Sequence, residues 1–319
     1  MSPVEVFSTA HSPITDPHVH VWGWEIPVYL FLGGFTAGLL VLSGYARWRG
    51  RRDPGPEPSF ALASSWLSLV GLLAISLGMV ALFLDLTHRA YVWRLYLAFE
   101  PGSPMSWGSW ILVLVYPVLI IGVLFAPPRQ LRERFPALAR LKRFADDDRL
   151  RRRLGLLSIA AGVALGVYTG ILLSSLGARP LWSSGLLGPL FLVSGLSTSA
   201  AFVHLVSPDP EERLGLLRLD NALILTEVAL LAFYLIGLAG SAEAHARAAE
   251  LLLGGPYTAV FWVGVVGLGL VVPLVIQVLV VTGRVAHTPV ASILVLLGGL
   301  ALRFVIVYAG QISHWSPRL

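Results

Sequence analysis

Carboxylates, an imidazole and phenols gather at one end of three apolar segments. Glu25 and Tyr29 are four residues apart at the start of the first segment, so they share a helix face. Asp85 and His88 close the second segment, and Tyr168 lies near the end of a later one. Together these groups can bind two carbonyl oxygens and exchange protons with them. Oxidation or reduction of a quinone needs this chemistry, because its two electrons travel with two protons.

Four of these five residues also have a structural interpretation. Tyr29 and Tyr168 are typical of the aromatic belt at a membrane interface. Glu25 suits the first turn of a helix, where the helix dipole favours a carboxylate. Asp85 can pair with Arg89, four residues later. The five residues together favour a quinone site more strongly than any one of them does.

A second set of charged residues lies inside apolar segments. Asp220 and Glu227 are seven residues apart and so lie on one helix face, and Arg303 lies in the last apolar segment. A charge within a bilayer is costly, which makes each of them a functional candidate. Glu227 and Arg303 can form a buried ion pair that fixes the fold. The alternative is that Asp220, Glu227 and Arg303 form a proton path.

Metal and haem chemistry has little support in the sequence. The chain has no cysteine, so it cannot ligate an iron–sulfur cluster. Two histidines that hold a haem must face each other within the membrane, and we expect His88, His204 and His287 to lie on different faces. His18 and His20 alternate in a polar terminal segment, which is weak support for a metal site. We therefore predict no haem, no cluster and no metal.

The composition predicts an all-α integral membrane protein. Of the 319 residues, 56% are hydrophobic and 13% are charged, whereas a soluble domain carries about 25% charged residues. Long apolar runs match the roughly 20 residues that span a bilayer. We expect an outer segment at 1–25, a first four-helix bundle with the quinone site at 26–176, and a second bundle at 177–319. The eight predicted spans are 26–46, 60–84, 107–126, 154–176, 185–206, 218–240, 256–281 and 290–311.

The basic residues predict the orientation of these spans. Of 23 Lys and Arg residues, 17 lie in or beside the loops after spans one, three, five and seven, and five lie on the opposite face. Positive loops stay in the cytoplasm, so both termini are expected on the outer, periplasmic face. The net charge of +5 therefore reflects topology, and we predict contact with lipid and none with nucleic acid. The first 25 residues lack the pattern of a cleavable signal peptide, so the first helix is expected to direct insertion.

Blocks of sequence from the first span to the last resemble one family. They are Trp22–Gly34, Asp85–His88 with Trp93 and Arg94, Ser103–Trp110, Tyr168–Ser175, Ala178–Trp182, Pro189–Thr198, and Arg303 with Tyr308–Gln311. Each block alone is weakly specific, but together they resemble the NrfD-like family, the membrane subunits of polysulfide-reductase-type complexes. The resemblance covers nearly the whole chain.

This resemblance implies a membrane anchor that exchanges electrons with menaquinone or ubiquinone and holds no catalytic centre, haem or cluster of its own. It implies a ferredoxin-like iron–sulfur subunit on the outer face and a molybdenum-bis(pyranopterin) catalytic subunit. It also implies the bacterial cytoplasmic (inner) membrane and anaerobic respiration. By position, the resemblance gives quinone contacts to Glu25, Tyr29 and Tyr168. Some relatives have Asn and His where Glu25 and Tyr29 stand, so the hydrogen bonds to the quinone are expected to differ.

Two other functions remain open at this stage. Asp220, Glu227 and Arg303 are compatible with a proton-translocating or transporter-like module, although transporters commonly contain inverted repeats and no clear repeat is seen here. A purely structural anchor would need none of this chemistry. The substrate-binding residues of such complexes lie in another chain, so this sequence identifies neither the terminal substrate nor the direction of electron flow.

Overall fold

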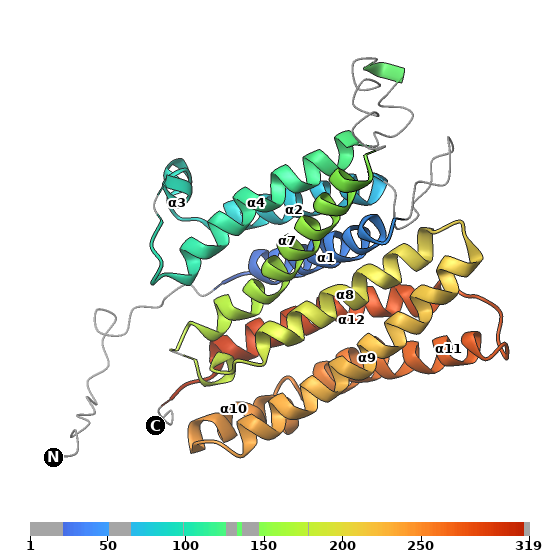
Figure 1. The fold of residues 1–319 in the computed structure, drawn as a ribbon. Coiled ribbons are helices and arrows are strands. Elements are labelled where there is room, and N and C mark those ends of the chain that lie inside the picture. The colour runs from blue at the N-terminus through green and yellow to red at the C-terminus, as the bar shows by residue number, and fades with distance from the viewer. Residues whose placement is uncertain are drawn as a thin grey trace.

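The computed structural model describes residues 22–50, 65–97, 99–125, 133–135, 147–177 and 179–315. Within these residues, eight helices are long and apolar enough to cross a membrane, which confirms the eight predicted spans. They run roughly side by side (Figure 1). They are α1 (Glu25–Trp48), α2 (Ser65–Asp85), α4 (Pro104–Phe125), α7 (Asp148–Ser174), α8 (Leu187–Val206), α9 (Pro210–Ala239), the π-helical η4 (Val260–Val271) continued by α11 (Val272–Val281), and α12 (Val290–Ile312).

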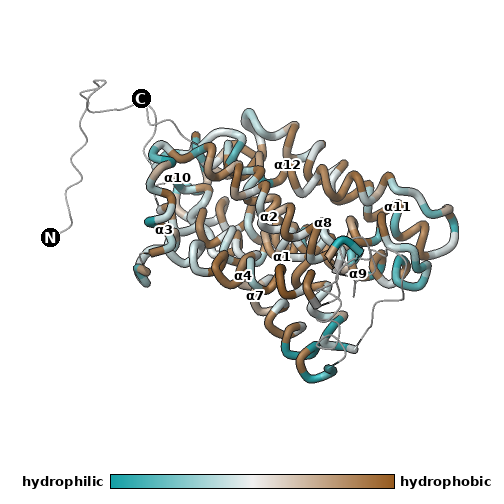
Figure 2. The backbone as a smooth tube through the Cα atoms, turned by 90° about the horizontal axis from the view of Figure 1, so that it is seen from above, coloured by the Kyte–Doolittle hydropathy of each residue, from teal (hydrophilic) through white to brown (hydrophobic). Residues whose placement is uncertain are grey.

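Some predicted features lie outside the described residues. These are residues 1–21 of the N-terminal segment, the first five residues of the predicted second span, most of the 127–153 loop, His18, His20 and Arg318. The apolar colour in Figure 2 follows the helices, and hydrophilic residues gather at their ends and connections. This distribution is what a bilayer requires, because the helices satisfy their own backbone groups while their flanks meet water.

Two spans begin earlier than predicted because a capped polar turn precedes the apolar run. The Asp147 side chain accepts hydrogen bonds from the backbone amides of Arg149 (2.9 Å) and Leu150 (3.4 Å), and α7 starts there. Asp209 accepts from the amide of Glu211 at 3.0 Å, and Pro210 occupies the first position of α9. Hydropathy marks where the apolar residues start, so it misses these turns.

Short helices lie between the spans and were not predicted. They are η1 (Arg89–Tyr91), α3 (Arg94–Leu97), η3 (Pro180–Trp182) and α10 (Glu243–Leu253). The eleven residues of α10 are amphipathic, with Ala244, Ala248 and Leu252 on the buried side. Figure 1 places α3 and α10 at the end of the molecule where α1 begins. The predicted outer end therefore carries helical structure of its own.

Helix α1 joins the two halves of the chain. It packs against α2 and α7 on one side and against α8 and α12 on the other, while α4 packs on α2 and α7, and α8 packs on α9. The α1–α8 contact is close because Gly38 and Gly195 bring the two backbones together; a Cβ at Gly38 would collide with the carbonyl oxygen of Gly195. Ser199 Oγ donates to the carbonyl oxygen of Phe35 at 2.6 Å across this contact. The division into two four-helix bundles remains an interpretation of this packing.

Candidate functional site

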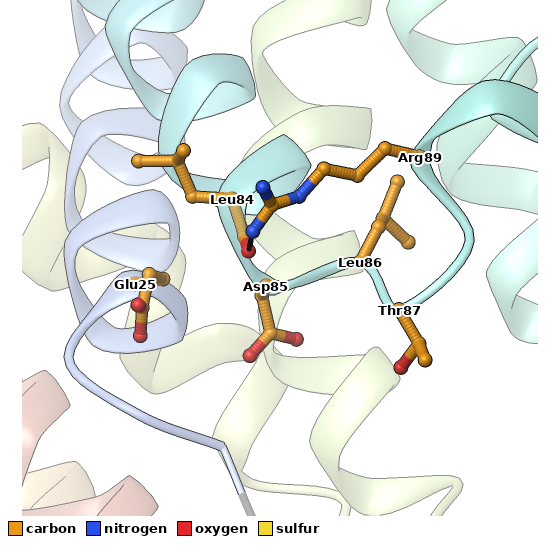
Figure 3. A pocket seen from close by; sticks show the side chains of 6 residues that line it. All are labelled: Glu25, Leu84, Asp85, Leu86, Thr87 and Arg89. Atoms are coloured by element: carbon orange, nitrogen blue, oxygen red, sulfur yellow. Dashed lines mark hydrogen bonds between the residues drawn. The ribbon is translucent and has the colours of Figure 1, made fainter.

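A pocket opens where α1 begins and α2 ends. Its volume is about 410 Å³. In Figure 3 the carboxylates of Glu25 and Asp85 point to the same side of the two helices. Arg89 folds back, and its Nη2 donates to the carbonyl oxygen of Leu84 at 2.5 Å. The lining residues are Glu25, Leu84, Asp85, Leu86, Thr87 and Arg89.

Helix ends position both carboxylates. Glu25 is the first residue of α1, at the positive end of the helix dipole. Asp85 is the last residue of α2, and the chain then turns into η1. The sequence places these two residues 60 positions apart, and the packing of α1 on α2 brings them to one pocket.

Two buried tyrosines lie at the same end of the helices, deeper than the pocket rim. Tyr29 follows Glu25 by one turn of α1 and is buried. Its ring packs on α2 at Gly78, where an added Cβ would lie 3.5 Å from the ring. Tyr168 of α7 is also buried, and its hydroxyl lies directly against Gly108 of α4. Among the described residues, neither hydroxyl forms a hydrogen bond. Both phenols are therefore available to a ligand.

Sequence reasoning missed two further phenols in this region. Tyr29 lies within electrostatic range of Tyr96 and Tyr116 as well as Tyr168. The Tyr116 hydroxyl is 3.3 Å from Ser76 Oγ of α2. Burial raises the pKa of Tyr96 on α3, and Tyr116 raises it further. The signal in the sequence was weak, because Tyr116 is one aromatic residue in a long apolar span.

The predicted quinone residues do not all line the pocket. Glu25 and Asp85 do, and Tyr29 and Tyr168 lie deeper at the same end. His88 is exposed and is absent from the lining. The geometry therefore supports the four other residues more directly than it supports His88, whose role stays a prediction.

Asp220 is held by two other helices. Its Oδ1 accepts a hydrogen bond from Ser197 Oγ of α8, and its Oδ2 accepts one from Gln277 Nε2 of α11, both at 2.6 Å. Asp220 and Gln277 are each 1% exposed. The carboxylate thus joins α8, α9 and α11 within the apolar part of the molecule.

Arg303 is buried and bonded to α8. Its Nη1 donates to Ser194 Oγ, its Nη2 donates to the carbonyl oxygen of Phe191 at 3.0 Å, and its guanidinium carbon lies 4.6 Å from the centre of the Phe191 ring. Glu227 is also buried and lies within reach of Ser194. Among the described residues, Glu227 and Arg303 form no direct salt bridge within 4.0 Å. Ser194 stands between the two charges, which attract each other over a longer distance.

One expectation about histidines was wrong. His204 and His287 were expected on different faces, but their Nε2 atoms are 2.7 Å apart, and His204 Nδ1 is 2.8 Å from Ser292 Oγ. The connection after α11 turns through Gly283, whose φ of +73° suits glycine, and returns His287 to the end of α8. Sequence spacing of 83 residues could not show this meeting.

The fold and the buried polar residues define a multi-pass helical membrane protein. The chain belongs to the NrfD family, since the family model described as "Polysulphide reductase, NrfD" matches residues 12–314. This match confirms the family resemblance seen in the sequence.

Curated relatives extend over most of the chain. It is 32% identical to the C component of the polysulfide reductase of Wolinella succinogenes, over 91% of this chain and 94% of the relative. It is 33% identical to protein NrfD of Escherichia coli, over 92% of this chain and 96% of the relative. It is 22% identical to the C component of the selenate reductase of Mesobacillus selenatarsenatis, over 92% of this chain and 74% of the relative.

Proposed function

We propose that this chain is the quinone-binding membrane anchor of a multi-subunit reductase complex. The pocket formed by Glu25 and Asp85 carries this proposal, together with the phenols of Tyr29 and Tyr168 at the same end, which form no hydrogen bond among the described residues. Relatives named as parts of polysulfide and selenate reductases support membership in such a complex. The chain has no cysteine to hold a cluster, so electrons would pass to a docked iron–sulfur subunit.

The residues present fit a quinone head group. A pocket of about 410 Å³ lies within the range of small-molecule sites. A bound menaquinone or ubiquinone would supply the two-electron, two-proton couple. Tyr29 and Tyr168 can donate hydrogen bonds to its oxygens, and Glu25 and Asp85 can accept its protons at their carboxylate oxygens. Arg89 places a positive charge beside the two carboxylates.

The proposed complex is arranged around this end of the molecule. Charge asymmetry supports N-out and C-out topology in the bacterial inner membrane, with the pocket on the outer side. The segment from η1 to α3, which follows the pocket residues in the chain, exposes Tyr91, Trp93 and Leu97. A ferredoxin-like iron–sulfur subunit docked there would lie next to the quinone, and a molybdenum-bis(pyranopterin) catalytic subunit would follow it.

A second candidate function rests on a separate observation. Asp220 and Glu227 are both buried in the second half of the chain, and each is bonded to or near polar side chains of other helices. Carboxylates in such places serve proton translocation in other membrane proteins. A complex that combines the two activities would use the first half of the chain for quinone exchange and the second half for proton movement.

Purification of the native complex tests the anchor function. We expect this chain to co-purify with an iron–sulfur subunit and a catalytic subunit, together with bound quinone. In liposomes the complex should reduce its acceptor with quinol as donor, or reduce quinone in the reverse reaction, and a quinone-site inhibitor should stop either. A complex without bound quinone, active with artificial donors but insensitive to the inhibitor, would instead identify a purely structural anchor.

A further inference from the structure

We propose that Trp182 and Gln311, from the second half of the chain, are positioning residues for Glu25 at the α1–α2 pocket. Both contact Trp22, which lies three residues before Glu25, and so they fix the point where the chain enters α1. The inference rests on the proposed quinone exchange, because it assigns a supporting structure to one residue of that site. Sequence reasoning linked neither Trp182 nor Gln311 to Glu25.

Helix α1 begins without a side chain that caps it. Trp24 occupies the N-cap position, but its side chain forms no capping hydrogen bond and is exposed. The first amides of a helix have no partner within the helix, so an uncapped first turn frays more easily. Glu25 is the first residue of that turn, and its carboxylate moves with it. A fixed carboxylate therefore requires contacts from outside α1.

Trp22 makes such contacts just before the helix. Its ring stacks on the ring of Trp182 of η3, with centroids 5.3 Å apart and 27° between the two planes. Its backbone carbonyl oxygen accepts a hydrogen bond from Nε2 of Gln311 of α12 at 2.9 Å. One contact holds the side chain and the other holds the backbone. Together they restrict both the position and the orientation of Trp22.

Trp182 is itself held firmly. Its side chain is 3% exposed, and its Nε1 donates to the carbonyl oxygen of Ile306 of α12 at 2.8 Å. The indole lies directly on Gly310, where an added Cβ would collide with Nε1. The carbonyl oxygen of the preceding residue, Leu181, accepts from the hydroxyl of Tyr234 of α9 at 2.6 Å. The support for the start of α1 thus extends to α9 and α12.

The Glu25 carboxylate turns back over the chain that Trp22 holds. An added Cβ at Gly23 would collide with Oε2 of Glu25, so the carboxylate lies against the backbone between Trp22 and the helix. In Figure 3 it points to the same side as the Asp85 carboxylate. A shift of the Trp22 backbone would therefore move one of the two pocket carboxylates. Misplacement of a reacting group by about 1 Å can lower a rate about 100-fold.

Chemical labelling of Glu25 tests this support without quinone. The purified complex is treated with a water-soluble carbodiimide and an amine, and mass spectrometry compares Glu25 with Glu250, an exposed carboxylate on α10. Gln311→Leu removes the donor to Trp22, so the first turn should fray and Glu25 should be labelled about threefold faster or more. The labelling rate of Glu250 should not change. Equal Glu25 rates in wild type and Gln311→Leu would overturn the proposal.

Turnover distinguishes positioning from a merely structural role. A short-chain ubiquinol and a short-chain menaquinol serve as probes. Gln311→Leu should lower kcat/KM for the active probe about tenfold, because the carboxylate is displaced. In the Glu25→Gln background the same substitution should have no further effect, since two residues that act through one group are not additive. Equal losses in both backgrounds would leave Gln311 with a structural role only and overturn the proposal.

Two further variants complete the experiment. Trp315→Phe removes another hydrogen bond near the end of α12, to the carbonyl oxygen of Gly177, and should change neither labelling nor turnover. Gly23→Ala is independent of folding, because the atoms nearest the added methyl group all belong to the flexible Glu25 side chain. It should lower kcat/KM about tenfold, and an unchanged value would overturn the proposal. A complex that oxidises neither quinol, but whose Glu25 labelling depends on Gln311, would refute quinone exchange alone.

Discussion

Tyr168→Phe is expected to lower quinol oxidation by the purified complex about 100-fold, the scale of losing one hydrogen-bond donor to a reacting oxygen. The Tyr168 hydroxyl forms no hydrogen bond with any described residue, so its removal breaks no contact that holds the fold. Assembly and thermal stability should therefore stay unchanged. Steady-state turnover at saturating quinol, together with subunit stoichiometry, measures both effects.

Two variants sharpen this experiment. Tyr45→Phe removes a hydroxyl from an exposed tyrosine at the far end of α1 and should keep full activity. Gly108→Ala adds a methyl group where the Tyr168 hydroxyl lies, so it should displace the phenol and reproduce the loss. Normal turnover in both Tyr168→Phe and Gly108→Ala would remove Tyr168 from the site.

Arg303→Met is expected to destabilise the complex by about 3–5 kcal/mol, the usual cost when one partner of a buried charged pair is removed. The substitution leaves Ser194 and the carbonyl oxygen of Phe191 without their donor. It also leaves Glu227 buried without a compensating charge. Thermal unfolding in detergent should show a lower midpoint and reduced yield of the assembled complex.

The effect of Arg303 can be separated from a general effect of arginine loss. Arg247 is half-buried; it pairs with the exposed Glu243 on α10 at 2.5 Å and donates to the carbonyl oxygen of Trp315 at 3.0 Å, so Arg247→Met should cost about 1 kcal/mol, well below the cost of Arg303→Met. The double variant Arg303→Met with Glu227→Gln should recover part of the stability, because it removes both charges. Equal midpoints for wild type and Arg303→Met would contradict a role for Arg303 in joining α12 to α8.

The sequence predicted the spans well because bilayer burial leaves a strong signal in composition. All eight apolar runs are helices, yet α9 starts eight residues before the predicted position. Its first turns hold Glu211, Glu212 and Arg213, and a hydropathy pattern treats such residues as loop. The amphipathic α10 was missed for a related reason, since only one of its faces is buried.

The candidate sites were harder to predict because they depend on which helices meet. Glu25 and Asp85 were placed at the same end by topology alone, and the α1–α2 contact does bring them to one pocket. The His204–His287 contact depends on the turn at Gly283, and the bridging position of Ser194 depends on side-chain geometry across three helices. A small polar residue such as Ser194 is common in membrane helices, so nothing in the sequence distinguished it.

Photoaffinity labelling of the purified complex with a photoreactive quinone tests the central claim most directly. The proposed site predicts saturable labelling of the start of α1 and of residues 84–89, which native quinone should prevent by competition. Glu25→Gln should reduce that labelling, and Glu250→Gln should not. Saturable labelling confined to α8–α12, or no competition by native quinone at the α1–α2 pocket, would contradict the account.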